Sequence, residues 1–154
     1  MDDTAMRLQA LEDRAEIANL IAAYGPLADT GDGEALAQLW VEDGVYDIGG
    51  FGLVQGHAAL AAMMESEVHR GLMEQGCAHM LSPHRIELSG DSAVAVGYST
   101  VMRKVGEVYE AWRVSANRWF LVRTEAGWRV KLRENTPLDG THEARSILEI
   151  LNVP

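Results

Sequence analysis

The chain has 154 residues, a length that suits one domain with a single hydrophobic core. Apolar residues make up 47% of the sequence and charged residues 23%, which is typical of a globular protein and excludes a fibrous or disordered chain. The formal net charge of −10 would repel a nucleic-acid backbone, and no run of lysines and arginines is present to bind one.

Cysteine usage and the first residues bear on the compartment. Cys77 is the only cysteine, so no internal disulfide can form, and a reducing cytoplasm is expected. The first residues are acidic and lead into an amphipathic pattern, unlike the basic start and short apolar stretch of a signal peptide. No stretch approaches the roughly 18 apolar residues that indicate a membrane span. We therefore expect a cytoplasmic protein with no membrane partner.

Helical periodicity dominates the first half of the chain. An amphipathic helix is predicted over residues 4–24, because apolar residues recur at steps of three and four, among them Leu8, Leu11, Ala15, Ala18, Ile21 and Ala22. The pair Gly25-Pro26 should kink or interrupt this helix and place Asp29 just past a bend. A second short helix, capped by Asp32, should run to Trp40. A third is expected over residues 57–69, followed by a loop between Gly71 and Gly76.

Extended patterns dominate the second half. A strand at 45–48 and the glycine cluster at 49–52 predict a hairpin, and further strands are expected at 80–88, 93–102, 108–124 and 128–135, the third of these with a bulge. A short helix over residues 141–151 closes the chain. Helices precede an antiparallel meander without βα alternation, so the predicted class is α+β, with one domain spanning residues 1–154.

Three segments together carry a family pattern. They are ALEDRAEI at 10–17 continuing through Tyr24, Asp29 and Trp40 to EDGVY at 42–46; His79 continuing to RIEL at 85–88; and RT at 123–124 continuing to GWRV at 127–130, with Arg133 beyond. In this order and spacing the chain resembles the SnoaL-like family of the nuclear transport factor two-like superfamily over nearly its whole length. The resemblance implies a cone of helices wrapped against a curved antiparallel sheet, an internal pocket, and a homo-oligomer, either a dimer or a trimer.

The resemblance also implies site residues. Asp29 and His79 match the acid and the histidine of the dehydrochlorinase of this superfamily, and Arg133 falls near its arginine. Tyr24 matches a tyrosine of the bile acid dehydratase. Met102 stands where that dehydratase carries a second acid, which argues against the same substrate chemistry here.

These residue types suit general acid–base catalysis. A histidine with its ordinary pKa of about 6.5 takes and gives a proton near neutral pH, and a carboxylate on its far nitrogen fixes the tautomer. We expect Asp29 to hold His79, and His79 to take a proton from a carbon beside an electron-withdrawing group. Tyr24 or Arg133 would stabilise the charge that develops. This chemistry needs no cofactor.

Each of the four residues also has a structural interpretation. Asp29 could cap a helix end or a loop, and His79 could be an edge-strand histidine with no catalytic role. Tyr24 could belong to the core, since an ideal helix turns it about 140° away from Asp29. Arg133 could lie on the surface, because it shares strand parity with two other basic residues.

Further residues are predicted to contact a substrate. Four aromatic or apolar side chains indicate an apolar ligand, although their spacing also suits a core: Trp40, Tyr46, Met102 and Trp119. Ser115 and Asn117 share a strand face with Trp119, as in a Ser-x-Asn pair of scytalone dehydratase, unless the bulge reverses their facing. The remaining histidines show no metal-ligand spacing, so neither a metal nor a cofactor is expected.

The predicted function is that of a cofactor-independent lyase, a dehydratase or a dehydrohalogenase, acting on a small, mostly apolar cyclic molecule. Two alternatives stay open. The same pocket could serve an isomerase or an epoxide hydrolase, or the domain could bind a small molecule without catalysis.

Overall fold

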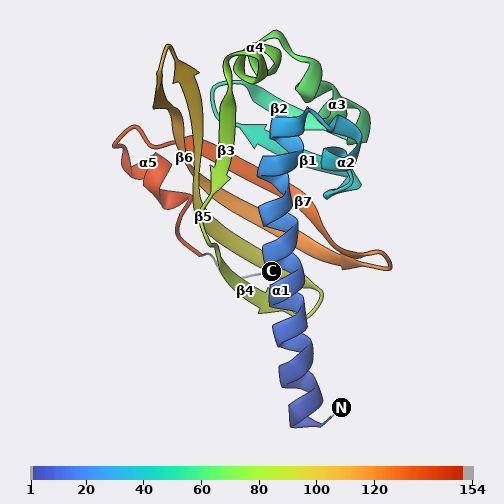
Figure 1. The fold of residues 1–154 in the computed structure, drawn as a ribbon. Helices are drawn as coiled ribbons and strands as arrows, with labels where there is room; N and C mark the ends of the chain where they lie inside the picture. Colours follow the sequence, from blue (N-terminus) through green and yellow to red (C-terminus); the bar gives the residue numbers. More distant parts are fainter. Residues whose placement is uncertain (1, 151–154) are drawn as a thin grey trace.

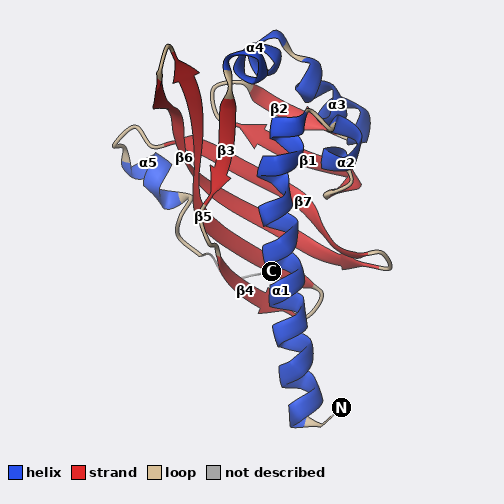
Figure 2. Ribbon diagram, viewed as in Figure 1, coloured by secondary structure: helices blue, strands red, loops and turns tan. Residues whose placement is uncertain are grey.

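Residues 2–150 are described by the computed structural model, in which helices pack against one twisted sheet (Figures 1 and 2). The helical segments are α1 (Asp3–Thr30), α2 (Gly33–Ala37), α3 (His57–Ala62), the 3-10 turn η1 (Met63–Glu65), α4 (Glu67–Gln75) and α5 (His142–Ser146). The strands are β1 (Trp40–Ile48), β2 (Gly52–Gln55), β3 (Cys77–Leu81), β4 (Arg85–Ser89), β5 (Ser92–Val105), β6 (Val108–Thr124) and β7 (Gly127–Pro137).

The strands lie in the order β2-β1-β7-β6-β5-β3, and β4 pairs with β5 as well. The strand expected over 80–88 is two strands, β3 and β4, because residues 82–84 leave the sheet and Pro83 has no N–H to donate. The predicted α+β class, with a curved sheet and covering helices, is confirmed. The sheet is mixed rather than wholly antiparallel, since β1 runs parallel to β7.

Helix α1 lies across one face of the sheet and runs without interruption to Thr30 (Figure 1). Pro26 is accommodated inside the helix, so the predicted interruption at Gly25-Pro26 is wrong. Asp29 therefore belongs to the last turn of α1, which ends at Gly31 with a left-handed φ of 69°. No helix within residues 2–150 is both long and apolar enough to cross a membrane.

The buried face of α1 matches the predicted one only in part, since Ile21 is buried as expected. Ile17, Tyr24 and Ala28 follow one another at steps of seven and four and are buried in the core. Leu8 and Leu11 are 55% and 65% exposed, because the first turns of the helix extend beyond the sheet (Figure 1). The three alanines assigned to the apolar face are exposed as well.

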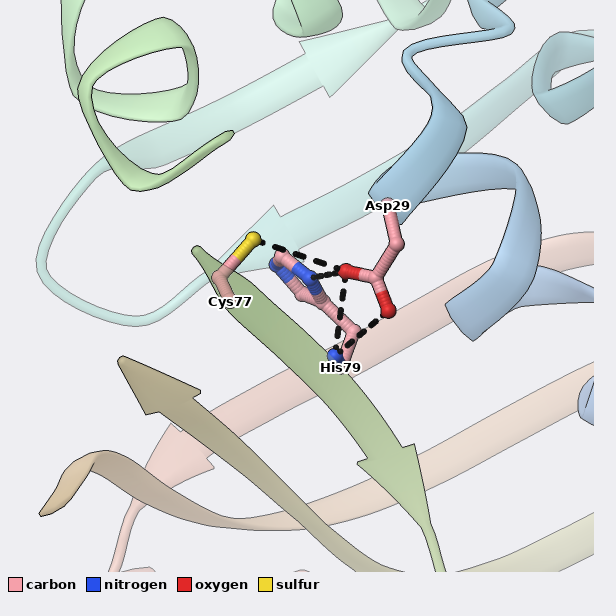
Figure 3. A group of neighbouring side chains, drawn as sticks. All are labelled: Asp29, Cys77 and His79. Atoms are coloured by element: carbon pink, nitrogen blue, oxygen red, sulfur yellow. Dashed lines mark hydrogen bonds and ion pairs between the residues drawn. The ribbon is translucent and has the colours of Figure 1, made fainter. Parts of the chain in front are cut away.

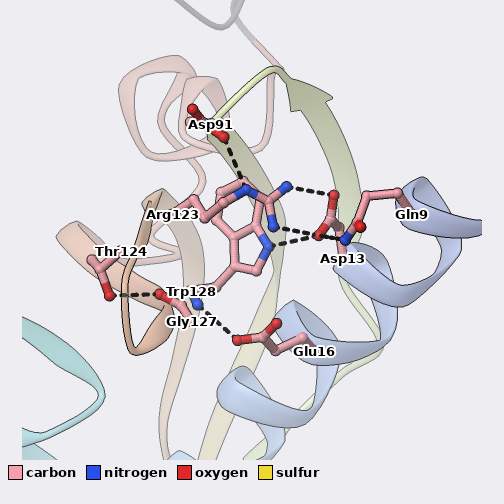
Figure 4. A network of polar contacts seen from close by, with 8 residues as sticks. All are labelled: Gln9, Asp13, Glu16, Asp91, Arg123, Thr124, Gly127 and Trp128. Atoms are coloured by element: carbon pink, nitrogen blue, oxygen red, sulfur yellow. Dashed lines mark hydrogen bonds and ion pairs between the residues drawn. The ribbon is translucent and has the colours of Figure 1, made fainter. Parts of the chain in front are cut away.

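A polar network fixes α1 to the sheet (Figure 4). Arg123 on β6 donates from Nη1 and Nη2 to the two oxygens of Asp13, at 2.8 and 2.7 Å, and holds the pKa of that carboxyl at about 2. The indole of Trp128 donates to Asp13 at 3.1 Å, and the backbone N–H of Trp128 donates to Glu16 at 2.7 Å. The bonds set the position of the helix along the sheet, and thereby the positions of the side chains in its last two turns.

The segment after β2 is more broken than predicted. The helix expected over 57–69 is divided, because Ser66 is extended and caps α4 by accepting from the N–H of His69. Helix α4 continues through Gly71, where a loop was expected, and ends at Gly76. The second helix is also shorter than predicted: Asp32 caps α2 as expected, but Trp40 already opens β1.

Two bulges interrupt the long strands. One lies where β6 pairs with β5 near Met102, which confirms the bulge predicted for residues 108–124, and the other lies on β7 at Lys131. Trp128 and Val130 are buried before the second bulge, and Arg133 is buried after it. The extra residue inverts the strand's parity, so the surface position considered for Arg133 is wrong.

The end of the described chain forms one short helix. Thr141 caps α5, which ends at Ser146, so this helix is shorter than the predicted 141–151. Residue 151, where that prediction ended, lies outside the described residues.

Candidate active site

Helices and sheet together enclose a cavity of about 270 Å³. Its wall is mostly apolar and aromatic and includes Tyr24, Tyr46, Ile48, Val54, Met63, Met64, Leu72, Val101 and Trp112. The wall also includes Phe51 and Val68, which are 56% and 48% exposed, so the cavity reaches the surface beside them. Ligand pockets usually measure about 300–1,000 Å³, so this one suits a small molecule.

His79 on β3 and Asp29 on α1 form a hydrogen-bonded pair (Figure 3). Nδ1 of His79 lies 2.7 Å from Oδ1 of Asp29, and the backbone N–H of His79 donates to both carboxylate oxygens at 3.1 Å. Because a carboxylate only accepts, the imidazole proton lies on Nδ1 and the lone pair on Nε2. No group within residues 2–150 forms a hydrogen bond with Nε2. His79 lines the cavity, so this nitrogen is available to a ligand there.

The pair depends on close packing of α1 against β3. A Cβ atom added at Gly25 would lie 2.2 Å from the carbonyl oxygen of His79, which is far inside van der Waals contact. Gly25 therefore serves close approach of helix and strand. Because Asp29 lies one turn further along α1, it reaches the backbone and the imidazole of His79 together.

Burial lowers the pKa of His79, and the charge on Arg133 acts in the same direction. The hydrogen bond to Asp29 opposes this effect without overcoming it. The imidazole is therefore neutral near pH 7 and can act as a base. Asp29 remains in place to stabilise the imidazolium that proton transfer would produce.

Arg133 lines the same cavity and is 1% exposed. Its guanidinium carbon lies 4.1, 4.5 and 4.2 Å from the ring centroids of Tyr24, Tyr46 and Trp119. Asn117 accepts from Nε at 3.0 Å and from Nη2 at 2.8 Å, whereas Nη1 has no partner among residues 2–150. The guanidinium is thus fixed in orientation and keeps one unused donor.

Tyr24 joins His79 and Arg133 in the cavity wall. Its ring centroid lies 6.3 Å from that of His79 in an edge-on arrangement. No kink in α1 is needed for this, because Tyr24 points between helix and sheet while Asp29 approaches β3 from the end of the helix.

The predicted substrate contacts divide into two groups. Tyr46 lines the cavity, whereas the wall does not include Trp40, Met102, Ser115, Asn117 or Trp119. The two tryptophan rings pack behind Tyr24, each with its centroid 6.2 Å from the tyrosine ring. Asn117 orients Arg133 from below, Ser115 is buried without a hydrogen bond among the described residues, and Met102 pairs with Ala78 in the sheet.

The sequence analysis missed six polar residues of the wall: Ser66, His69, Ser99, Thr100, Arg113 and Asn135. His69 donates from Nε2 to the carbonyl of Ala28 at 2.7 Å, and its ring centroid lies 5.5 Å from that of His79. Asn135 could have been found, because it shares a strand face with Arg133. His69 and Arg113 reach the cavity through contacts far apart in sequence, which no local pattern reveals.

Asp29, Cys77 and His79 form the one cluster within residues 2–150 whose spacing could hold a metal ion (Figure 3). Burial raises the pKa of the Cys77 thiol to about 11, and the protonated thiol donates to Asp29 at 3.6 Å. The thiol and the imidazole thus donate to the same carboxylate, which suits a hydrogen-bonded cluster better than a ligand set of thiolate and free imidazole nitrogen. That the protein binds no metal stays a prediction.

Fold and site together define an α+β cone with a histidine–aspartate pair beside a mostly apolar internal cavity. The chain belongs to the SnoaL-like family, because the SnoaL-like domain profile matches residues 9–134. This confirms the resemblance inferred from the sequence.

Solved structures share this architecture. An NTF2-like protein with a cystatin-like fold from Novosphingobium aromaticivorans is 52% identical over 97% of this chain and 99% of its own, with a TM-score of 0.94. A proposed aromatic ring hydroxylase from the same species is 26% identical over 83% of this chain and 90% of its own, with a TM-score of 0.65. A proposed dehydratase of the NTF2-like family from Streptomyces avermitilis is 14% identical over 84% and 98%, with a TM-score of 0.65, and shows the fold alone. No curated protein matches the chain in sequence.

Proposed function

We propose that the protein is a cofactor-independent lyase, a dehydratase or a dehydrohalogenase, acting on a small, mostly apolar cyclic molecule in the cavity. The observation that carries this proposal is the state of His79. Asp29 holds its Nδ1 proton, its pKa is lowered, and its Nε2 is unbonded within the described residues at the cavity wall. A neutral, oriented imidazole beside an apolar cavity is suited to remove a proton from carbon.

The proposed reaction is a β-elimination. Nε2 of His79 takes a proton from a carbon next to a carbonyl, the electron pair of that C–H bond forms a double bond to the neighbouring carbon, and the leaving group departs with its own bonding pair. A halide leaves as the anion. A hydroxyl leaves as water after the imidazolium returns the proton to it. Asp29 stabilises the imidazolium, and Tyr24 and Arg133 stabilise negative charge on the carbonyl oxygen.

The experiment is a turnover screen followed by mass spectrometry. Cyclic ketones and acids that carry a β-hydroxyl or a β-halide are incubated with the protein, and elimination is recognised by loss of water or of hydrogen halide. Gain of water would instead identify a hydrolase, and a rearranged product of unchanged mass an isomerase.

The variants His79→Ala and Asp29→Ala test the assignment of the pair. Each is expected to lose about 10²- to 10⁴-fold in turnover while keeping its circular dichroism spectrum. His142→Asn, an exposed histidine at the start of α5, is the matched control and should keep wild-type activity. Wild-type turnover in either site variant would refute the proposal.

We also propose that the protein is a homo-oligomer. Tyr98, Tyr109 and Val114 are 51%, 63% and 43% exposed, and the pairing of β5 with β6 places them on one sheet face. Exposed apolar side chains gathered on one face are typical of a subunit interface. Light scattering should give a multiple of the 16.9 kDa chain mass, and Tyr98→Lys should reduce it. A monomer at micromolar concentration would contradict this proposal.

A further inference from the structure

Two guanidinium groups line the cavity without a carboxylate to neutralise them. Arg133 is 1% exposed, and Arg113 lies nearer the mouth, with its guanidinium carbon 5.4 Å from the ring centroid of Phe51. Every ion pair found within residues 2–150 involves other side chains. Other cations, such as Lys131 and Arg145, also form no ion pair, but Arg133 is the one lysine or arginine buried within residues 2–150 of this chain of net charge −10.

Both guanidiniums are held in the same way. Arg133 donates from Nε and Nη2 to Oδ1 of Asn117, at 3.0 and 2.8 Å. Arg113 donates from Nε and Nη2 to Oδ1 of Asn135, at 3.2 and 2.8 Å. The two asparagines are themselves joined, since Nδ2 of Asn135 donates to Oδ1 of Asn117 at 2.9 Å. The amide oxygens orient both guanidinium groups but supply no negative charge. The two arginines are therefore preorganised and keep their positive charges.

One hydrogen-bond donor of Arg133 has no acceptor among the described residues. Nη1 of Arg133 is buried and unbonded among the described residues, although the residue lines the cavity. A buried donor of a charged group is rarely left unpaired, because its desolvation is not compensated. Arg133 therefore brings an uncompensated positive charge to the cavity wall.

The two cations also oppose each other. Burial lowers the pKa of Arg113, and the charge of Arg133 lowers it further. A negative charge that reaches both groups would relieve this repulsion, which a neutral ligand would not do.

We propose that the ligand carries a carboxylate on its apolar ring system, and that the guanidinium groups of Arg133 and Arg113 bind this group. Tyr24 and Tyr46 then pack against the ring. The inference rests on the proposed function only in taking the same cavity as the ligand site, and it narrows the substrate class to small cyclic carboxylic acids.

The test measures equilibrium binding of acids and of their neutral amides. Benzoate and 2-naphthoate are compared with benzamide and 2-naphthamide by quenching of tryptophan fluorescence, since Trp112 lines the cavity. At least one acid should bind about 10-fold or more tightly than its amide, because the carboxylate gains charge-assisted hydrogen bonds that the amide lacks. 2-Naphthol is included as a phenol of similar shape, and it should bind no more tightly than the amide.

Three variants locate the effect. Arg133→Met should reduce the preference for acid over amide to about one, and Arg113→Met should reduce it in part. Lys131→Met removes one positive charge from an exposed position on the same strand as Arg133 and should leave the preference unchanged.

Failure of every acid to bind more tightly than its amide in the wild-type protein would overturn the inference, and so would tighter binding of 2-naphthol than of 2-naphthoate. Neither result bears on proton transfer by His79, which turnover tests separately. The wild-type comparison decides the matter even if Arg133→Met does not fold.

Discussion

Replacing Gly25 by alanine has two effects of opposite sign on the free energy of unfolding. In a helix interior alanine is favoured over glycine by about 1 kcal/mol. At Gly25, however, the new Cβ would lie 2.2 Å from the carbonyl oxygen of His79, and contacts below 3.0 Å are essentially never observed. Helix α1 and strand β3 must therefore separate by nearly an ångström. Such overpacking costs about 1–3 kcal/mol. After the gain of about 1 kcal/mol from alanine, the net destabilisation should be at most about 2 kcal/mol.

Thermal unfolding measures this balance directly. A loss of about 2 kcal/mol lowers the Tm of a domain of this size by roughly 4–8 °C. The same displacement moves His79 away from Asp29, and a misplacement of about 1 Å costs on the order of 10²-fold in turnover. Gly71→Ala is the matched control, because no atom of residues 2–150 outside its own stretch of helix backbone lies within 4 Å of its Cβ position in α4. This change should raise stability by about 0.5–1 kcal/mol. A similar rise in Tm for Gly25→Ala would refute the role given to close packing.

Three further changes test other parts of the structure. Asp29→Asn should lower kcat by about 10²- to 10⁴-fold, because an amide stabilises the imidazolium of His79 poorly. Steady-state kinetics check this, with circular dichroism to show that the fold is unchanged. An unchanged kcat would contradict the prediction. Burial lowers the pKa of His84 to about 4, whereas its pKa in the unfolded chain is about 6.5. About 3 kcal/mol of folding stability that is present above pH 6.5 should therefore be lost when the pH falls to 4. Urea unfolding at both pH values should show a smaller loss for His84→Gln, and an equal loss would exclude this origin. Asp13→Asn should lower the free energy of unfolding in urea by about 1–3 kcal/mol. Asp91→Asn should lower it by less than about 1 kcal/mol, because the side chain of Asp91 is 83% exposed. Equal losses would show that the buried network contributes little.

Much of the fold could be predicted from local pattern. The β-branched and aromatic runs predicted the long strands β5, β6 and β7, and Asp32 marked the start of α2. The local pattern mispredicted the structure where a contact between segments far apart in the sequence determines it. Gly25-Pro26 was expected to kink or interrupt the first helix, yet α1 continues through Pro26 to Thr30 against the sheet. Tertiary contacts thus outweighed a local penalty.

The candidate site was predictable only in part. Asp29 and His79 were named through the family resemblance, and they lie in hydrogen-bonding contact. Arg133 was harder to place, because the bulge at Lys131 inverts the inward face of β7, and a regular two-residue alternation assigns Arg133 to solvent. Ser115 and Asn117 do face inward as considered, but they support the wall from behind rather than form it.

Nothing in the sequence indicated that Asn117 and Asn135 are hydrogen-bonded to each other beside the two arginines of the cavity. Asn117 and Asn135 lie 18 residues apart and are joined only because β6 and β7 are neighbours in this register. Strand pairing therefore places Arg113 and Arg133 beside one cavity, in a chain whose net charge is −10.

The central claim is that His79, oriented by Asp29, removes a proton from a ligand bound in the cavity. The most direct measurement compares wild-type protein with His79→Ala for one ligand in two assays, equilibrium binding and product formation. We predict that the variant binds the ligand with wild-type affinity and forms product at least about 10²-fold more slowly. Equal rates of product formation in the two proteins would contradict the claim.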